Sequence, residues 1–308
     1  MNPLCIIWVI WYILVAFVKL FIPRSLRYKR IQDEVAVVTG AGSGIGQLMA
    51  IELAKEGCHV ICWDVNSQGN EDTVSQIRQL PNGKAHSFVV DVGQRESVYA
   101  AAGKIPAVTD GKDVTILINN AGVVFGKHLL EIPDDKIDQM LNINCLGHFW
   151  TTKSFLPGMM KCEKGHIVTI SSMMGLWCPL EKMTAYASSK FGAFGFDQAL
   201  NSELKITDKD FIKTTIVTPG HINTGMFHGA SFRYGLEADY VAREIIASLK
   251  AEDETRVIPS FGYLVYLIYA VLPRTASFEL TKGMKLNTVF QNLEVREPLT
   301  TPEGKKND

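Results

Sequence analysis

No excess of either charge is present in the chain, because 31 Lys and Arg residues balance 32 Asp and Glu residues and leave a formal net charge of −1. The two signs are interspersed, so no global basic field attracts nucleic acid, and none of the standard nucleic-acid-binding signatures occurs. Six cysteines lack both metal-type spacing and an obvious disulfide framework, and seven histidines form no ligand motif. We therefore expect no nucleic-acid partner, no metal site and a reducing cytosolic environment.

Internal repeats are absent too, and from Val35 onward predicted strands and helices alternate along the chain. Strands are expected over residues 35–39, 58–63, 86–90, 114–118, 166–170, 212–217 and 256–258. Helices are expected over residues 45–56, 70–79, 95–103, 135–155, 184–204 and 237–249. This order predicts a single α/β domain with a doubly wound parallel sheet of the Rossmann type, covered by helices on both faces. Ligands of such sheets bind beyond the carboxyl ends of the strands.

A glycine cluster follows the first predicted strand. Gly40, Gly44 and Gly46 would allow a tight turn, close approach of a pyrophosphate, and close packing of the next helix, whose amino terminus would face the anion. The spacing differs from the usual G-x-G-x-x-G, and a flexible surface turn is the alternative interpretation. The pattern therefore favours a dinucleotide site once further strand-end residues support it.

Asp64 supplies such support, because it ends the second predicted strand where an acidic residue would meet an adenosine ribose. A carboxylate there accepts hydrogen bonds from both ribose hydroxyls and repels a 2′-phosphate. Neither Val65 nor Asn66 is basic, which points the same way. The expected cofactor is therefore NAD rather than NADP, although Asp64 could also be an ordinary turn residue.

Tyr186 and Lys190 lie four residues apart, which places a phenol and an ammonium on one face of a helix. A nearby cation favours the charged form of a phenol and lowers its pKa toward the working range of a general base. A solvated helix surface is the alternative for the isolated pair. Together with the glycine cluster and Asp64, the pair predicts a catalytic tyrosine.

From about Glu34 to Pro259 the chain resembles the short-chain dehydrogenase/reductase family. The ordered markers are the Thr39–Gly46 motif, Asp91, Asn119-Asn120-Ala121-Gly122, Asn144, Ser172, Tyr186, Lys190, Pro219-Gly220 and Thr224. Three further stretches resemble the membrane-associated branch that holds epidermal-type retinol dehydrogenases and 17-beta-hydroxysteroid dehydrogenases of lipid droplets. These stretches are Leu146–Lys153, Gly165–Thr169 and Lys213–Thr215.

The resemblance implies a role for each marker. Tyr186 would exchange a proton with the substrate hydroxyl. Lys190 would lower the pKa of Tyr186 and hold the nicotinamide ribose, and Ser172 would donate a hydrogen bond to the substrate oxygen. Asn144 would support a proton-relay water, whereas its alternative is a helix amide bonded to the backbone. The expected substrate contacts are Ser172 and Tyr186. The expected cofactor contacts are Gly40, Ser43, Gly44, Ile45, Gly46, Asp64, Asp91, Asn119, Ala121, Gly122, Tyr186, Lys190, Pro219, Gly220 and Thr224.

One departure concerns the serine, because the interval from Ser172 to Tyr186 is one residue longer than in the family. We expect the extra residue in the intervening loop. Ser172 is preferred over Ser171 because Met173-Met174-Gly175 follows it, although either hydroxyl could face the substrate.

The resemblance implies an NAD-dependent oxidoreductase that interconverts a lipophilic alcohol and its carbonyl, foremost all-trans-retinol and retinal. A 17-beta-hydroxysteroid or other lipid-alcohol dehydrogenase is the alternative substrate assignment. A catalytically silent scaffold on lipid droplets or the endoplasmic reticulum is the alternative of a different class. Family relatives also imply a homodimer formed through helices 135–155 and 184–204.

The amino terminus carries an apolar segment, Leu4 to Ile22, whose helical length would be about 28 Å. No basic region precedes it and no small-residue cleavage pattern follows, so a cleaved signal peptide is not expected. Whether the segment spans the membrane or enters one leaflet stays open. The basic residues that follow place the domain in the cytosol: Arg24, Arg27, Lys29 and Arg30.

The carboxyl-terminal part is divided into an apolar segment and a polar tail. Residues 1–30 are interpreted as anchor and basic flank, 31–260 as the catalytic domain, 261–292 as a membrane-associated or substrate-mouth segment, and 293–308 as tail. The final Lys305-Lys306-Asn307-Asp308 resembles a dilysine signal of the endoplasmic-reticulum membrane, and lipid droplets are a second expected location. Residues 224–237 are interpreted as a lid that closes over a lipophilic substrate.

Overall fold

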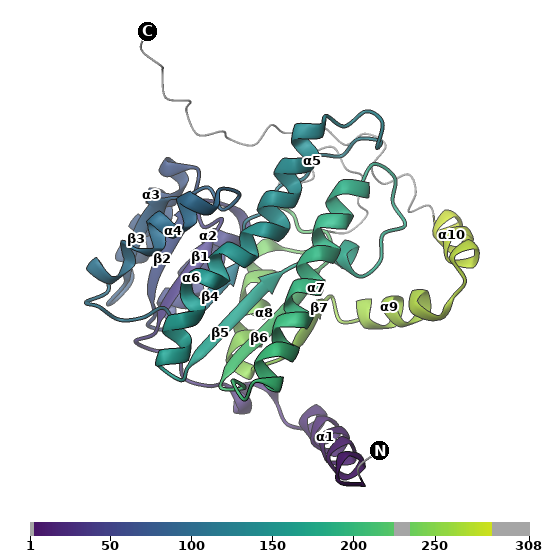
Figure 1. Ribbon diagram of the computed structural model, residues 1–308, viewed down its shortest axis with the longest axis horizontal. Coiled ribbons are helices and arrows are strands. Elements are labelled where there is room, and N and C mark those ends of the chain that lie inside the picture. Colours follow the sequence, from purple (N-terminus) through teal and green to yellow (C-terminus); the bar gives the residue numbers. More distant parts are fainter. Residues whose placement is uncertain (1–2, 225–234, 285–308) are drawn as a thin grey trace.

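The computed structural model describes residues 3–224 and 235–284 (Figure 1). Seven parallel strands form one sheet in the order β3-β2-β1-β4-β5-β6-β7. The strands are β1 (Val35–Thr39), β2 (His59–Asp64), β3 (Lys84–Val89), β4 (Ile116–Asn119), β5 (Gly165–Ile170), β6 (Ile212–Pro219) and β7 (Thr255–Ile258). The order reverses between β1 and β4, which creates the switch point where such folds bind ligands. The predicted doubly wound α/β fold is confirmed.

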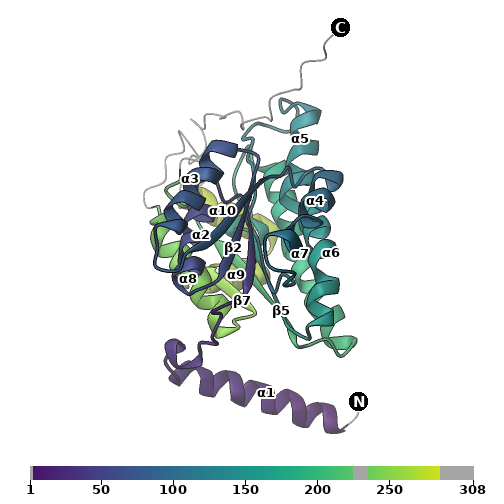
Figure 2. The ribbon, with the colours of Figure 1, turned by 90° about the vertical axis from the view of Figure 1, so that its left-hand side faces the viewer.

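Helices cover both faces of the sheet, as Figure 2 shows. One face carries α2 (Gly44–Lys55), α3 (Ser67–Arg78) and α8 (Ala238–Ala251). The other carries α4 (Arg95–Ala102), α6 (Gly147–Lys161) and α7 (Thr184–Ile206). The central strands are apolar at successive positions because both of their faces are buried; β1, for example, is buried at all five residues.

The long helix expected over residues 135–155 is divided in the structure. Helix α5 (Asp134–Leu141) continues into a π-helical turn (Asn142–Leu146), which leads into α6. A π-helical turn accommodates one extra residue and is frequent at functional sites. Here it contains Asn144, and this local widening has no signature in the hydrophobic pattern.

Two helical parts lie outside the α/β core. Helix α1 (Pro3–Phe21) and the short 3₁₀ helix η1 (Arg24–Arg27) precede the sheet, while α9 (Gly262–Val271) and α10 (Arg274–Gly283) follow β7 (Figure 1). Within residues 3–224 and 235–284, no helix combines the length and the apolarity needed to cross a membrane. The segment predicted over residues 261–292 contains both α9 and α10 in its described part, and no pattern in the sequence separated the two helices.

Candidate active site

A cavity of about 420 Å³ opens at the carboxyl ends of the strands. It collects nearly all of the residues that the sequence predicted for the cofactor and the reaction. The predicted residues that line it are Gly40, Ser43, Gly44, Ile45, Gly46, Asp64, Asp91, Ala121, Gly122, Ser172, Tyr186, Lys190, Pro219, Gly220 and Thr224. The ends of six separate strands, β1 to β6, therefore contribute to one site.

The glycine loop has the backbone geometry that a phosphate cradle requires. Gly40 and Gly44 have φ angles of +67° and +56°, in the left-handed region where a side chain is unfavourable. A Cβ atom at Gly46 would lie 1.9 Å from the carbonyl oxygen of Gly40, so only glycine lets α2 pack this closely. Ser43 precedes α2 without a side-chain cap, which leaves backbone N–H groups at the helix start available to an anion.

Asp64 lies at the end of β2 beside this loop. Its carboxylate accepts hydrogen bonds from the backbone N–H groups of Gly42 and Asn66, both at 2.8 Å. The carboxylate also lines the cavity, so it combines a turn-forming role with a position suited to a ribose. The hydrogen bonds show the turn-forming interpretation, and contact with a ribose stays a prediction.

Tyr186, Ser172 and Lys190 meet at the inner wall of the cavity. Tyr186 and Lys190 are each 4% exposed, and the Lys190 ammonium lies 6.0 Å from the centre of the Tyr186 ring. Lys190 Nζ donates to the carbonyl oxygen of Ile170 at 2.9 Å, which fixes the ammonium beneath the phenol. Ser172 is hydrogen-bonded to Tyr186 and also accepts from the backbone N–H of Met174 at 3.1 Å.

Burial dominates the electrostatics of this pair. It raises the pKa of Tyr186 above its ordinary value, against a smaller lowering by the hydrogen bond with Ser172. Burial also lowers the pKa of Lys190 to about 8. The net shift of the Tyr186 pKa is therefore upward, opposite to the predicted lowering, because desolvation of the phenol is the largest contribution.

Asn144 is buried and its side-chain amide is fully engaged. Its Oδ1 accepts from Val123 N–H and its Nδ2 donates to Val123 C=O, both at 2.8 Å. Nδ2 also donates to Ser189 Oγ at 3.0 Å. These contacts agree with the alternative interpretation from the sequence, in which Asn144 is a helix amide bonded to the backbone. The Asn144 side chain does not line the cavity.

The two adjacent serines have different surroundings. Ser171 Oγ donates to the carbonyl oxygen of Lys190 at 2.8 Å, which connects β5 to α7. Ser172 Oγ instead bonds to the tyrosine, and the residues between the two form a 3₁₀ turn (Met173–Gly175), a loop and the start of α7 at Thr184. This geometry favours Ser172 as the hydroxyl that meets a substrate.

Asn119 differs from the expectation. Its side chain is 1% exposed and its Oδ1 accepts from Thr151 Oγ1 at 2.7 Å, so it points into the helical layer and not into the cavity. Strand alternation gives the physical reason, since Asn119 shares the sheet face of Leu117, which packs in that layer.

Asn120, which sequence reasoning did not single out, takes the place beside the glycine loop. Its Nδ2 donates to the carbonyl oxygens of Thr39 and Gly40, at 2.9 and 3.3 Å. Thr39 Oγ1 in turn accepts from the backbone N–H groups of Asn120 and Ala121. The Asn-Asn pair was visible in the sequence, but only strand register shows which asparagine faces the loop.

The proposed lid over residues 224–237 lies mostly outside the described residues, which exclude 225–234. Its two ends are described and lie together: Ile222 and Leu236 form a β-bridge, and Asn223 N–H donates to Leu236 C=O at 2.9 Å. Thr224 also approaches Gly44, because a Cβ atom there would lie 3.6 Å from the threonine side chain.

Comparison with known proteins identifies the family of this chain. A family model described as short chain dehydrogenase matches residues 34–233. Retinol dehydrogenase 10-B of Danio rerio is 38% identical over 292 residues, covering 86% of this chain and 85% of that protein. Retinol dehydrogenase 10 of Homo sapiens is 36% identical over 297 residues, with the same coverage.

Solved structures show the same fold. A metagenomic short-chain oxidoreductase in complex with NADP has a TM-score of 0.63 at 26% identity, covering 74% of this chain and 98% of that one. An archaeal alcohol dehydrogenase from Thermococcus sibiricus has a TM-score of 0.66 at 24% identity, covering 73% and 96%, and supports the fold alone. The chain belongs to the short-chain dehydrogenase family of oxidoreductases, which use NAD or NADP.

Proposed function

We propose that the protein is an NAD-dependent dehydrogenase of lipophilic alcohols, with all-trans-retinol as its first substrate to test. One observation carries the reaction type: the buried Ser172–Tyr186–Lys190 group lies in the same cavity as the glycine loop and Asp64. The choice of retinol is supported by the names of the relatives, which are 36–38% identical to this chain.

In the proposed reaction the alcohol oxygen lies between Ser172 and Tyr186. The carbinol carbon loses a hydride while the alcohol O–H loses its proton, which leaves the carbonyl product. NAD supplies the hydride acceptor when bound. Tyr186 acts in its deprotonated form, which the ammonium of Lys190 stabilises. This tyrosinate receives the alcohol proton and becomes the neutral phenol, while Ser172 donates a hydrogen bond to the oxygen. Carbonyl reduction is the same sequence in reverse.

The choice of NAD over NADP is supported by Asp64. Its carboxylate lines the cavity at the end of β2, where it would accept hydrogen bonds from ribose hydroxyls and repel a 2′-phosphate. The carboxylate is held in place by the N–H groups of Gly42 in the glycine loop and of Asn66 directly after β2. A metagenomic relative of the fold binds NADP, so this preference requires direct measurement.

A lipophilic substrate is supported by the apolar surroundings of the tyrosine. Tyr186 belongs to a separate cluster of buried side chains made with Phe125, Ile132, Met140 and Met183. Partly buried apolar side chains of the loop before α7 pack against this cluster, including Met174 and Leu180. Val123 and Val124, which pack against the same cluster, line the cavity, and a small polar alcohol would leave this part of the wall without apolar contacts.

Attachment to the endoplasmic-reticulum membrane, with the domain facing the cytosol, is part of the proposal. Support comes from the exposed apolar residues of α1, among them Trp8, Trp11 and Phe17, which are 55–58% exposed. Isolated apolar residues are ordinary on protein surfaces, but a contiguous apolar helix indicates an interaction site. Lipid droplets are the second proposed location.

NADH formation across a panel of all-trans-retinol, estradiol and long-chain alcohols tests this function. Selective turnover of retinol supports the proposal, and selectivity for estradiol would assign the steroid instead. Tight NAD binding without turnover of any lipid alcohol would support the scaffold alternative. The purified full chain in detergent, with NAD and NADP run in parallel, is the appropriate sample.

A further inference from the structure

The exposed apolar residues of α1 surround the whole helix. From Ile6 to Leu14, nine consecutive residues are 45–66% exposed, which covers more than two helical turns. A protein groove covers only one face of a helix, so this pattern fits a medium that surrounds the helix, as the acyl chains of a phospholipid surface do.

Helix α9 presents a second apolar surface. Leu264, Leu267 and Val271 are 61%, 59% and 74% exposed, and Phe261 before the helix is 66% exposed. Both α1 and α9 lie outside the α/β core, toward the lower right of Figure 1. The two helices come from opposite ends of the chain, so something in the fold has to fix their relation to each other.

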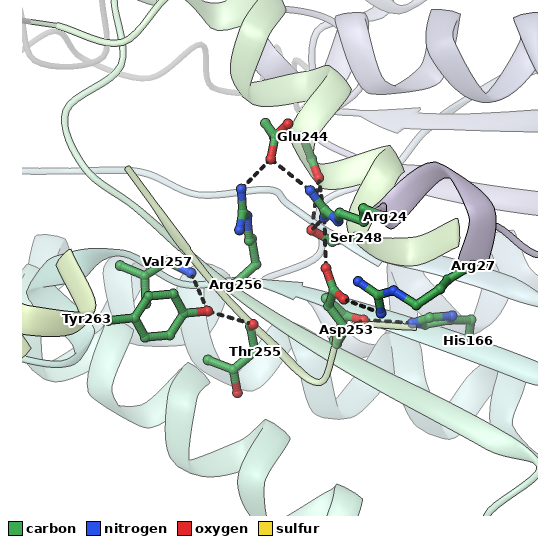
Figure 3. Close-up of polar contacts among 11 residues, drawn as sticks. Arg24, Arg27, His166, Glu244, Ser248, Asp253, Thr255, Arg256, Val257 and Tyr263 are labelled. Carbon is green, nitrogen blue, oxygen red and sulfur yellow. Dashed lines mark hydrogen bonds and ion pairs between the residues drawn. The ribbon is translucent and has the colours of Figure 1, made fainter. Parts of the chain in front are cut away.

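The chain after α1 is bound to the core through charged contacts, shown in Figure 3. Arg24 forms ion pairs with Glu244 and Asp253, both at 2.9 Å, and donates a hydrogen bond to Ser248. Glu244 also binds Arg256 of β7 at 2.5 Å. The Arg24–Glu244–Arg256 chain therefore joins the end of the apolar helix to strand β7, and Arg27 adds a contact to Asp253 at 3.6 Å.

Lys29 extends this attachment to the middle of the sheet. Its Nζ lies 2.8 Å from Nδ1 of the buried His166 on β5, and His166 Nε2 lies 2.8 Å from Thr215 Oγ1 on β6. Thr215 Oγ1 donates to the carbonyl oxygen of Asp253. The segment from Arg24 to Lys29 is thus held by side chains from the same end of the sheet.

The start of α9 is attached to the same strand. Tyr263 Oη donates to Thr255 C=O at 2.8 Å and accepts from Val257 N–H at 3.2 Å (Figure 3). Thr255 and Val257 flank Arg256, which carries the contact to Glu244. Strand β7 therefore holds the two apolar helices from adjacent residues.

Helix α9 also contacts the loop that carries the catalytic serine. The Tyr269 and Trp177 rings have their centres 3.9 Å apart. A Cβ atom at Gly262 would lie 3.2 Å from the Met173 methyl group, while one at Gly220 would lie 3.4 Å from the Met173 sulfur. Met173 thus lies between the start of α9 and the strand end that lines the cofactor cavity.

We propose that β7 is the mount that holds α1 and α9 against one phospholipid surface, so that the loop after Ser172 faces the lipid from which the substrate comes. The mount consists of the Arg24–Glu244–Arg256 contacts and the Tyr263–Thr255/Val257 hydrogen bonds. This inference rests on the proposed function for its substrate, whereas the orientation of the two helices is independent of turnover. The mount residues are positioning residues, since they lie outside the cavity.

Hydrogen exchange of the full chain with and without phosphatidylcholine vesicles tests the mount. We expect vesicles to slow exchange of α1 and α9 amides in the unaltered protein. The double variant Arg24→Gln/Arg27→Gln leaves the contacts of α9 itself intact. We expect vesicles to slow the exchange of α9 amides at least about fivefold less in this variant than in the unaltered protein, while α1 amides are still protected. This result supports coupling of the two helices through β7. Arg243→Gln is the matched control, because it removes a guanidinium from an exposed ion pair with Asp239 on the same helix as Glu244.

A second pair of variants addresses the other half of the mount. Tyr263→Phe removes the hydroxyl that binds β7 and should reduce α9 protection on vesicles, whereas Tyr266→Phe removes a hydroxyl from the same helix outside the mount and should not. Turnover of vesicle-dissolved retinol should fall relative to turnover of a water-soluble secondary alcohol in the mount variants alone. Unchanged α9 protection in both mount variants, or no protection of α9 in the unaltered protein, would overturn the inference. If the protein turned over no alcohol, the proposed function would be wrong. The hydrogen-exchange result would still test how the two helices are held.

Discussion

The side chain of Asn144 forms a two-way hydrogen-bonded pair with the backbone of Val123, accepting from its N–H and donating to its C=O, both at 2.8 Å. The pair connects the π-helical turn to the segment after β4, and Gly122 lies between the asparagine and Lys190. A Cβ atom at Gly122 would be 3.3 Å from Asn144 Oδ1 and 3.5 Å from Lys190 Nζ. Asn144 therefore positions the wall against which Lys190 lies.

Asn144→Ala should destabilise the protein, because both backbone groups of Val123 would lose their partner. We expect the free energy of unfolding to fall by about 2–6 kcal/mol, from two groups at roughly 1–3 kcal/mol each. Urea denaturation of the two proteins measures this change. Equal denaturation midpoints would show that the hydrogen bonds between Asn144 and Val123 do not contribute to the stability of the fold.

Tyr186→Phe should abolish most turnover while leaving NAD binding nearly intact. The phenol is the proposed proton acceptor, and loss of such a group costs between about 10²- and 10⁴-fold in rate. Steady-state NADH formation and NAD titration by protein fluorescence measure the two effects separately. Substantial turnover in the variant would remove the tyrosine from the proposed role.

Lys190 should make stability rise with pH in the alkaline range. Burial lowers its pKa from 10.5 to about 8 in the folded protein. Between these values the unfolded chain binds more protons than the folded one, so the free energy of unfolding increases as pH rises. Relative to Lys190→Met, the unaltered protein should gain roughly 2 kcal/mol between pH 8 and 10.

Denaturant titrations of both proteins across that pH range give the difference directly. The same comparison in a Tyr186→Phe background removes the titration of the neighbouring phenol, whose pKa burial raises. A difference that is flat with pH would mean that Lys190 keeps its ordinary pKa.

Asp64→Ser should shift cofactor preference toward NADP. Removing the carboxylate removes its repulsion of a 2′-phosphate, and we expect the ratio of kcat/KM for NADP to that for NAD to rise at least about tenfold. Asp64→Asn is the control for the turn, because its amide oxygen retains an acceptor for one of the two N–H groups, those of Gly42 and Asn66, without the charge. An unchanged ratio in both variants would place cofactor discrimination elsewhere.

The sheet could be predicted from sequence because its strands are short apolar runs separated by helical segments, and β1 was assigned with the same bounds as in the structure. The cavity could be predicted because parallel strands bring their carboxyl ends to one edge. Gly40, Asp64 and Tyr186 are far apart in the chain, yet topology alone brings them to one cavity.

Three features depend on geometry that no local pattern encodes. Asn119 and Asn120 exchange roles because strand register determines which of them faces the glycine loop. The pKa of Tyr186 is raised and not lowered, because burial outweighs the hydrogen bond with Ser172. In the sequence, Arg24 and Arg27 indicate only a basic segment after the apolar helix. In the folded chain they form ion pairs with acidic residues more than 200 positions away.

The attachment of residues 24–29 has a practical consequence for shortening the chain. A version that begins at residue 31, chosen to improve solubility, would lose Arg24 and Lys29 together with the apolar helix α1. Glu244 and Asp253 would then keep fewer counterions, and His166 would lose the ammonium now 2.8 Å from its ring. A version that begins at Pro23 would discard the helix and retain every one of these partners.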